Sequence, residues 1–489
     1  MNYMIHTFIS LAICVSSELD VPFSVANSAW KSELGNHRVR VYVSEKSNAV
    51  LAEIQWRRRD PNPENKAIMI FDSLTGEQIK NVFAFEISRE YGKIVFQPIS
   101  APGEYYIYYM PYKANPIPWA YTTEYLTPQS TADQKWLNSI SNIDNLPKAK
   151  VLEIQARTEF DRFDPMEVIA TKAEIKSLVE SHKDRSYLLF PEDRKYPIRM
   201  SDDLPLRWIR NGAKDEFIGE ALRGEFYVFQ IGVYSIKSDI EDLDIDFDKG
   251  TIPINGEFQF FNKNGFDWLG RPLHKTISIK SNKVGALWFG MQIPENAKPG
   301  EYYGNLIIKP KNLPETRVRI SLKLDEKTIE DNGDNELWRL ARLRWLNSTI
   351  GLDDEVTKPY TPLKINGKEV ECLGRSVKFA DNGLPDGIKS SSYEILARPI
   401  TLNIKTGNDL ISNDNSKITL SKETNGTVVW DSVCENEYFA TICQSKMEFD
   451  GFVNFRISIR PKRNIDVKDI YLDIPINREI AVYMMGMGC

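Results

Sequence analysis

Alternation of apolar and polar residues is the strongest local pattern in this chain, and it predicts β-strands. Val39, Val41 and Val43 alternate with Arg38, Arg40 and Tyr42, a period of two that is typical of a strand with one buried face. The same period recurs in three further runs, 50–57, 318–324 and 455–460. Because Gly, Pro, Asn and Asp separate these runs, the sequence favours antiparallel sandwiches.

One pentapeptide, Pro-Gly-Glu-Tyr-Tyr, occurs at 102–106 and again at 299–303. Proline fixes φ and glycine accepts a positive φ, so each copy predicts a tight turn before an apolar strand. We expect each strand to be the last of a sandwich, with residues 113–118 and 323–334 as exits to the next unit. The alternative is chance recurrence of a common hairpin signal.

A helical region separates the two copies. Trp136, Ile140 and Ile143 have helical spacing, and Thr171 with Glu174 forms a capping box at a helix N-terminus. The chain is therefore expected to be mainly β, with three consecutive antiparallel β-sandwich domains and a short helical segment between the first and second. The predicted spans are a signal peptide at 1–17, sandwich 1 at 18–118, the helical connector at 119–185, sandwich 2 at 186–330 and sandwich 3 at 331–489.

The composition of the chain excludes several classes of protein function. The chain has 489 residues, 42% of them hydrophobic, which suits about three domains and excludes a disordered protein. The net charge of −6 provides no basic field for nucleic acid. Four histidines and five cysteines are few soft ligands, and their spacing fits no zinc pattern, so we expect neither a metal nor a cofactor.

The N-terminus carries an apolar stretch from Phe8 to Val15, the length of a secretory h-region and too short to span a bilayer. We predict a cleaved export signal and a periplasmic or cell-surface location, with no transmembrane segment. Two alternatives stay open: a lipid anchor on Cys14, or an ordinary first strand. Cys434 and Cys443 flank a predicted hairpin, where a disulfide and two buried thiols are both compatible with the sequence.

Catalytic patterns are weak. No Gly-x-Ser-x-Gly elbow or phosphate-binding glycine loop occurs, and His37, His182 and His274 are expected at the surface or at caps. The acidic clusters 353–355 and 202–203 are weighed as carboxylate pairs for glycoside hydrolysis, and 241–248 as a calcium site. Surface acids explain all three better, so no catalytic residue and no metal ligand is predicted.

Aromatic residues gather between Phe258 and Trp268. Sugar rings stack on aromatic side chains, so Phe266 and Trp268, which follow the loop 262–265, are the candidate glycan-binding residues. The competing interpretation places Phe258 and Phe260 in the core and Trp268 beneath the loop.

Several long segments resemble the N-terminal, non-catalytic region of glycoside hydrolase family 123-like proteins of Bacteroidetes. They read ARTEFDRFDPMEVIAT, LLFPEDRKYPIRMSDDLPLRWI, GEFYVFQIGVY, LRWLNSTIGLDDEVTKPYTPL and AVYMMGMG, and they lie between about residue 150 and residue 489. The resemblance is weaker over the first sandwich.

The resemblance implies β-sandwiches placed before a TIM-barrel catalytic domain that acts on β-linked N-acetylgalactosamine. In that family the substrate's 2-acetamido oxygen attacks the anomeric carbon, an Asp orients the amide, and a neighbouring Glu is the acid/base. No position in this chain matches that pair. The expected partner is a glycan bearing N-acetylgalactosamine, the chain is expected to lack the barrel, and by itself it is expected to be inactive. The alternative is a complete, non-catalytic glycan-binding or adhesion protein.

Overall fold

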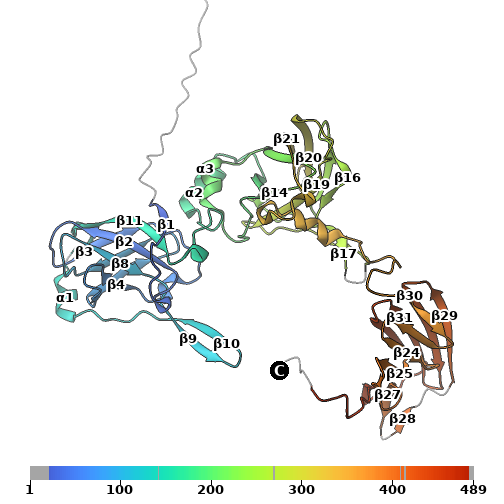
Figure 1. The fold of residues 1–489 in the computed structure, drawn as a ribbon. Coiled ribbons are helices and arrows are strands. Elements are labelled where there is room, and N and C mark those ends of the chain that lie inside the picture. Colours follow the sequence, from blue (N-terminus) through green and yellow to red (C-terminus); the bar gives the residue numbers. More distant parts are fainter. Residues whose placement is uncertain (1–20, 141, 268–269, 408, 412–414, 484–489) are drawn as a thin grey trace, which may run out of the picture. The chain divides into compact units, whose positions relative to one another are not determined.

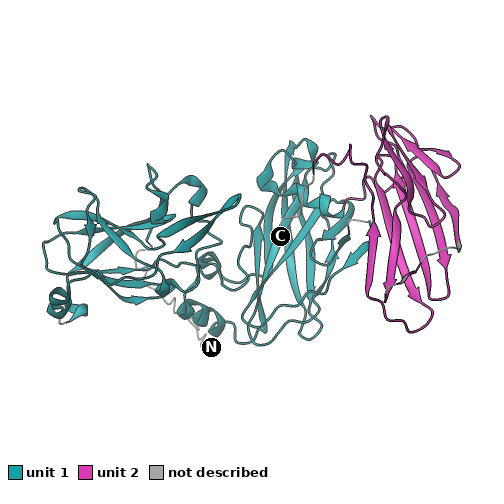
Figure 2. Cartoon of the chain, turned by 90° about the horizontal axis from the view of Figure 1, so that it is seen from below, with its two compact units in different colours: residues 1–347 teal, residues 348–489 magenta. Residues whose placement is uncertain are grey.

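The computed structural model describes residues 21–140, 142–267, 270–407, 409–411 and 415–483. The predicted signal peptide, Cys14, Trp268 and Cys489 lie outside these residues. The chain divides into two compact units, residues 1–347 and 348–489 (Figure 2). The prediction of a mainly β protein is confirmed, because strands dominate both units and the helices are short (Figure 1).

The first sandwich is built on one long path of strands. The order is β5-β4-β8-β2-β11-β3-β7-β6, with β1 paired to β11. As the alternation predicts, Val39, Val41 and Val43 of β2 are buried in its core. The strands are β1 (Phe23–Val25), β2 (His37–Val43), β3 (Val50–Ile54), β4 (Met69–Asp72), β5 (Gln78–Ile79), β6 (Val82–Ile87), β7 (Gly92–Phe96), β8 (Gly103–Tyr108) and β11 (Lys148–Ala156).

Strand β11 comes from the segment expected to be the helical connector. It pairs antiparallel with β2 and parallel with β1 and β3, so the first sheet extends well past residue 118. A register break between Val151 and Glu153 interrupts its alternation, and its partners lie about a hundred residues away in sequence. Local periodicity therefore gave no clear sign of this strand.

The expected exit after β8 is instead a two-stranded ribbon of β9 (Tyr112–Ile117) and β10 (Ala120–Tyr125). It projects from the first sandwich in Figure 1. Strand β11 follows β8 in the chain and joins the same sheet, so β8 is not the last strand of its sandwich.

Two helices follow the ribbon. Helix α1 (Gln134–Ser139) is capped by Asp133, whose carboxylate accepts the Lys135 and Trp136 amides, and it ends before Ile143, earlier than the spacing predicts. Helix α2 (Lys172–Glu180) has the predicted capping box of Thr171 and Glu174. Glu174 also accepts both terminal nitrogens of Arg57 at 2.8 Å, which ties the helix to the end of β3.

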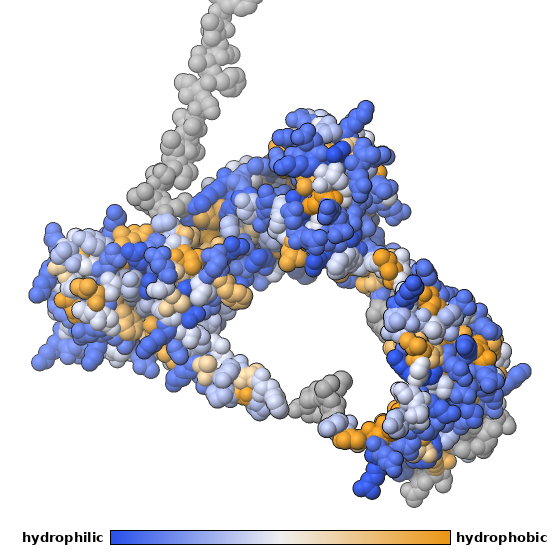
Figure 3. Space-filling model, viewed as in Figure 1, coloured by the Kyte–Doolittle hydropathy of each residue, from blue (hydrophilic) through white to orange (hydrophobic). Residues whose placement is uncertain are grey.

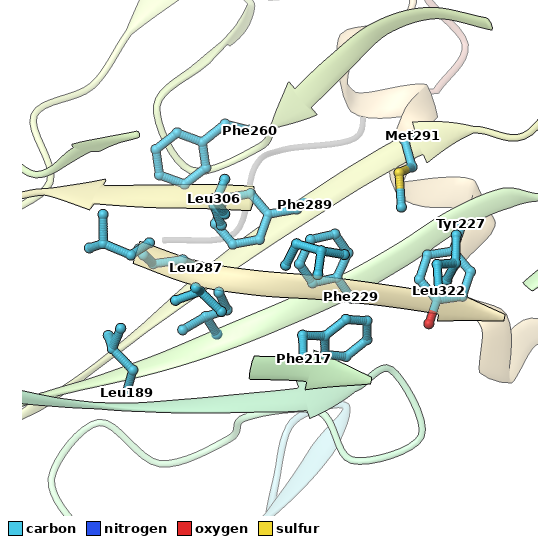
Figure 4. Packing of buried hydrophobic residues seen from close by; sticks show 14 of the residues in the cluster. Leu189, Phe217, Tyr227, Phe229, Phe260, Leu287, Phe289, Met291, Leu306 and Leu322 are labelled. Carbon is cyan, nitrogen blue, oxygen red and sulfur yellow. The ribbon is translucent and has the colours of Figure 1, made fainter. Parts of the chain in front are cut away.

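The second sandwich has two four-stranded sheets, ordered β12-β14-β19-β16 and β13-β21-β20-β15. Strand β14 is buried along its whole length, because its outer face is covered by α3 (Leu206–Asn211) and neighbouring segments. Figure 4 shows the core, where Phe217 stacks on Phe229 at 4.7 Å. The strands are β12 (Tyr187–Asp193), β13 (Glu216–Arg223), β14 (Phe226–Ser235), β15 (Asp244–Asp248), β16 (Asn255–Phe260), β19 (Val284–Gln292), β20 (Gly300–Lys309) and β21 (Thr316–Thr328).

The segment 331–347 packs on the second sandwich, although the sequence suggested that it opens the third. It consists of three 3₁₀ turns at Asp331–Gly333, Leu337–Arg339 and Ala341–Asn347. Ala341 lies against Phe226 and Val228 of β14.

The third sandwich forms the second unit. Its sheets have the orders β22-β23-β24-β25-β26, β28-β27-β33 and β29-β30-β31-β32, and Val377, Trp430 and Met447 are in its main core. The strands are β22 (Lys364–Asn366), β23 (Glu369–Cys372), β24 (Arg375–Phe379), β25 (Pro385–Ser390), β26 (Tyr393–Glu394), β27 (Thr401–Thr406), β28 (Asp409–Ile411), β29 (Asn415–Glu423), β30 (Thr427–Glu435), β31 (Phe439–Glu448), β32 (Val453–Pro461) and β33 (Asp469–Asp473).

Candidate functional site

The predicted glycan-binding loop forms a small hairpin of β17 (Asn264–Phe266) and β18 (Pro272–His274). Phe266 is 38% exposed at the end of β17. Trp268, the second predicted residue, lies outside the described part of the chain. The hairpin is closed by Asp267, whose carboxylate accepts the amide and the Nε of Arg271 at 2.9 and 2.7 Å.

The other aromatic residues of this cluster belong to the core. Phe258 stacks on Phe247 with ring centroids 3.8 Å apart, and Phe260 is buried against Phe289. Among the described aromatic residues of this cluster, Phe266 is therefore the one that is exposed on the hairpin.

Three acids of the clusters 202–203 and 353–355 are held in ion pairs. Asp203 accepts both terminal nitrogens of Arg89 at 2.9 and 2.6 Å, and Asp202 lies 2.7 Å from the Lys283 ammonium. Asp354 pairs with Lys422 at 2.7 Å. Because charged partners hold Asp202, Asp203 and Asp354, we interpret these three carboxylates as structural contacts.

The acidic run 241–248 contains β15, an edge strand beside β20. Asp244 and Asp246 each lie 2.7 Å from a lysine ammonium, Lys263 and Lys309 respectively. Acidic residues along an exposed edge discourage pairing with other chains. Among the described residues, no group of three or more His, Cys, Asp or Glu side chains has an arrangement suited to a metal ion.

Two buried glutamates were missed by the sequence analysis. Glu225, at the start of β14, is fully buried, and its Oε1 accepts Arg194 at 2.7 Å and Arg339 at 3.1 Å. Its Oε2 accepts the Leu222 amide at 2.8 Å. Burial raises the pKa of the Glu225 carboxyl, while the two guanidinium groups and the amide act in the opposite direction.

Glu192 on β12 is 5% exposed, and its Oε1 accepts Arg207 Nε at 2.9 Å and Trp208 Nε1 at 3.1 Å. Burial again raises the pKa of this carboxyl. A general acid needs access to the substrate oxygen that it protonates. Because Glu192 and Glu225 are both buried and bonded to arginines, they stabilise the second sandwich and have no open face for a sugar.

The three histidines differ in their surroundings. His182, at the end of α2, has its Nδ1 2.9 Å from the Leu178 carbonyl oxygen, a cap contact as expected, and His274 is exposed on β18. His37 differs from the surface position expected for it. Its ring is half-buried and stacks on Phe163 at 4.2 Å, its Nε2 lies 2.9 Å from the Asp161 carbonyl oxygen, and burial lowers its pKa.

Cys434 and Cys443 are free, buried thiols on the adjacent strands β30 and β31. Cys434 is paired in register with Thr441, and Cys443 with Ser432. The two cysteines are therefore diagonal neighbours, which fits the interpretation as two thiols and not the disulfide.

The ribbon of β9 and β10 carries several exposed aromatic residues. Every residue from 113 to 125 is exposed. Trp119, in the turn, is fully exposed, and Tyr121 is 74% exposed. The sequence analysis missed this ribbon because two prolines, Pro116 and Pro118, suggested an exit segment.

A groove of about 320 Å³ opens at the base of the ribbon. Its apolar wall includes Val82, Ala84 and Phe85 of β6, and Thr127 and Pro128, which follow β10, line its other side. The ammonium of Lys66, another lining residue, lies 4.6 Å from the Tyr125 ring centroid. In the described part of the chain, no helix is long and apolar enough to cross a membrane.

Two family models match the chain. Residues 28–157 match the glycoside hydrolase 123 N-terminal domain, and residues 363–489 match the glycoside hydrolase 123 third domain. Together they cover just over half of the sequence. The chain belongs to the glycoside hydrolase 123-like proteins. A comparison of this chain with curated proteins gave no match.

Solved structures give weaker likenesses to this glycoside hydrolase 123-like protein. A family 123 glycoside hydrolase from Clostridium perfringens, studied for glycolipid glycan hydrolysis, is 15% identical with a TM-score of 0.22, covering 29% of this chain and 27% of its own. The Pseudomonas aeruginosa CupB2 chaperone is 10% identical with a TM-score of 0.16, covering 50% and 96%. The chain thus spans about a quarter of the length of the Clostridium enzyme, and the family assignment rests on the two family models.

Proposed function

We propose that this chain is the accessory β-sandwich region of an exported glycoside hydrolase that acts on glycans bearing β-linked N-acetylgalactosamine. The observation that carries the proposal is the pair of family matches, one to an N-terminal domain and one to a third domain. In this proposal a separate barrel supplies the acid/base Glu and the orienting Asp.

The ion pairs and burial of the acidic residues in this chain support an accessory role without catalysis. Most glycosidases use two carboxyl groups that face the same sugar across a space of about 5–10 Å, and a substrate-assisted enzyme still needs an accessible acid/base Glu beside its Asp. In this chain Asp202, Asp203 and Asp354 are instead bonded to lysine or arginine. The buried Glu192 and Glu225 are each bonded to a guanidinium group.

The test is a hydrolysis assay of the purified 489-residue chain on an aryl β-N-acetylgalactosaminide. We expect no turnover above the rate of a heat-denatured control. Turnover that a Glu192→Gln or Asp354→Asn change abolishes, without unfolding the chain, would place the active site in these sandwiches and refute the proposal. The coding sequence after Cys489 is a second test, because the proposal expects a barrel with an adjacent Asp and Glu there.

A second candidate function is glycan binding without catalysis, and the exposed ring of Phe266 favours it. Phe266→Ala and Trp268→Ala are then expected to abolish retention on a glycan array that the parent chain shows. Phe260→Leu, a core change on the preceding strand, is the control for altered folding. Equal retention by all four proteins would eliminate this candidate.

A further inference from the structure

Strand β10 has an unprotected free edge. Among the described strands it pairs with β9 alone, and its six residues keep an unbroken register from Ala120 to Tyr125. It contains no proline, no lysine and a single charge, Glu124. Its Tyr and Thr residues favour extended structure, so its outer N–H and C=O groups are suited to accept another strand.

The other described edge strands of five or more residues are protected against pairing with another chain. Each of them contains a register break, a proline or several charged residues, and these features commonly prevent unwanted strand pairing. Register breaks occur in β6, β13, β16 and β29, prolines in β9 and β12, two arginines in β32, and two or three aspartates in β33 and β15.

The ribbon also lacks a covering layer. Both of its faces are exposed, and a two-stranded hairpin is at best marginally stable in water by itself. Figure 3 shows pale and orange residues along it, with few of the strongly hydrophilic ones that cover the sandwiches. A ribbon with these properties gains stability from a partner.

We propose that β10 pairs antiparallel with β10 of a second copy of this chain, about a two-fold axis at Thr123, and that this pairing makes the protein a dimer. A two-fold axis perpendicular to the ribbon places the same face of both copies on the same side. Odd-numbered residues of β10 can therefore lie opposite only odd-numbered residues of the partner strand, and even-numbered residues opposite even-numbered ones. With Thr123 opposite Thr123 of the partner subunit, Tyr121 lies opposite Tyr125 of the partner subunit. On the other face, Thr122 lies opposite Glu124 of the partner subunit.

This register is self-complementary across all four strands. Tyr125 is paired with Tyr112 of β9, and Tyr121 with Pro116, so each row on one face holds Pro, Tyr, Tyr and Tyr. Aromatic cross-strand pairs of this kind stabilise sheets. Each row on the opposite face places Glu124 between Lys113 of its own chain and Thr122 of the partner subunit. A register centred on Thr122 would bring no tyrosines together.

The same register explains the exposed tryptophan. It sets Trp119 level with Thr127 of the partner subunit, beside the groove that Thr127 and Pro128 line. The groove volume of about 320 Å³ and its Phe85, Val82 and Ala84 wall suit an indole ring. Two such insertions, related by the axis, add the buried apolar area that strand pairing alone lacks.

The experiment is sedimentation equilibrium of the full chain and its ribbon variants. The parent chain is expected to be a dimer, and Thr123→Lys, which sets two ammonium groups face to face at the axis, is expected to raise the dissociation constant at least about tenfold. An equimolar mixture of Thr123→Lys and Thr123→Glu is expected to recover the dimer. Trp119→Ala is expected to weaken dimerisation without affecting that recovery.

Thr122→Lys is the matched control, because it lies opposite Glu124 of the partner subunit and is expected to leave the dimer intact. The substituted residues are all exposed, so circular dichroism should be unchanged for all variants. A parent chain that is monomeric at all concentrations, equal loss in Thr122→Lys and Thr123→Lys, or no recovery in the mixture would each overturn the proposal. So would a monomer whose Trp119 fluorescence shifts on adding a glycan, which would assign the ribbon to sugar. None of these outcomes depends on the proposed glycosidase role.

Discussion

The first two sandwiches use the same five residues, Pro-Gly-Glu-Tyr-Tyr, at the start of a central strand, and the two copies end in different surroundings. Tyr105 of β8 is fully buried, and its hydroxyl accepts the Ser100 amide and donates to the Ser100 carbonyl oxygen. Tyr302 of β20 is only partly buried, and its hydroxyl donates to the Lys298 carbonyl oxygen from a solvent-exposed position.

The glycines of the two copies are required for different reasons. A Cβ on Gly103 would lie 2.7 Å from Ser100 Oγ, so a side chain there would force the Ser100 hydroxyl to move. Gly300 has open space around it but a φ of +153°, which L-residues rarely adopt. The last tyrosine keeps one role in both copies, because Arg38 lies over Tyr106 and Arg319 over Tyr303.

The difference teaches that a short motif fixes the turn and the strand direction, while the neighbouring strands decide how deeply each side chain is buried. One glutamate from each sandwich provides a second contrast. Glu104 of the first copy pairs with Arg40 at the surface, whereas Glu225 is enclosed in the second sandwich.

The largest expected effect tests that contrast. Glu225→Ala leaves two guanidinium groups without their shared carboxylate inside the protein, so we expect it to lower the free energy of unfolding by about 3–5 kcal/mol. Glu104→Ala removes a partly exposed ion pair and should cost less than about 1 kcal/mol. Urea unfolding followed by pulsed hydrogen exchange of β14 and β8 peptides measures both. Equal losses would mean that Glu225 is not enclosed.

The next effect compares the two tyrosines directly. Tyr105→Phe leaves the buried Ser100 amide and carbonyl without their shared partner, and we expect a loss of about 1–3 kcal/mol in the first sandwich. Tyr302→Phe lets water replace the hydroxyl and should change stability by less than about 0.5 kcal/mol. The same exchange experiment, read on β8 and β20 peptides, separates them. A larger loss for Tyr302→Phe would reverse the ranking of the two environments.

The smallest expected effect is a change in the stability of the first sandwich at acidic pH. Burial raises the pKa of Asp60, but the hydrogen bonds and charges of Arg58 and Lys66 outweigh burial and bring it below its usual value. Its contribution to stability is therefore present above the unfolded-state pKa and is lost as pH falls through the folded-state pKa. Glu192 and Glu225 have raised pKa values, so their contribution has the opposite sign and improves on acidification.

We therefore expect the first sandwich to lose more stability than the second between neutral pH and about pH 3. Equilibration in urea at each pH, followed by exchange labelling at one fixed pH, measures the two sandwiches separately. Asp60→Asn is the matched variant, and it should reduce the pH dependence of the first sandwich alone, while Asp72 and Glu153, whose pKa values are also lowered, maintain the rest. An unchanged pH dependence in that variant would show that Asp60 is not the group responsible.

Much of the local structure could be predicted from the sequence. The strands with strict alternation, such as β2, and the capping box of α2 are confirmed, because each depends on residues that are close together in the chain. The family resemblance is confirmed as well, including the first sandwich, where the resemblance in sequence is weaker. The burial of Phe258 and Phe260 agrees with the core alternative for the aromatic cluster.

Other features could not be predicted in this way. The pairing of β11 with β2, the enclosure of Glu225 by Arg194 and Arg339, and the exposure of the β9–β10 ribbon each depend on segments distant in sequence. Phe266 was identified by its neighbourhood in the sequence, and its exposure became known only from the hairpin that presents it.

The sequence by itself determined the class of fold, the positions of many strands and the family, because periodicity, turn residues and long motifs are properties of contiguous residues. The tertiary structure decided which carboxylates are enclosed, which aromatic rings face solvent and which strand edges stay open. The physical reason is that burial and pairing are set by the packing partner, and for a sheet protein that partner lies far along the chain.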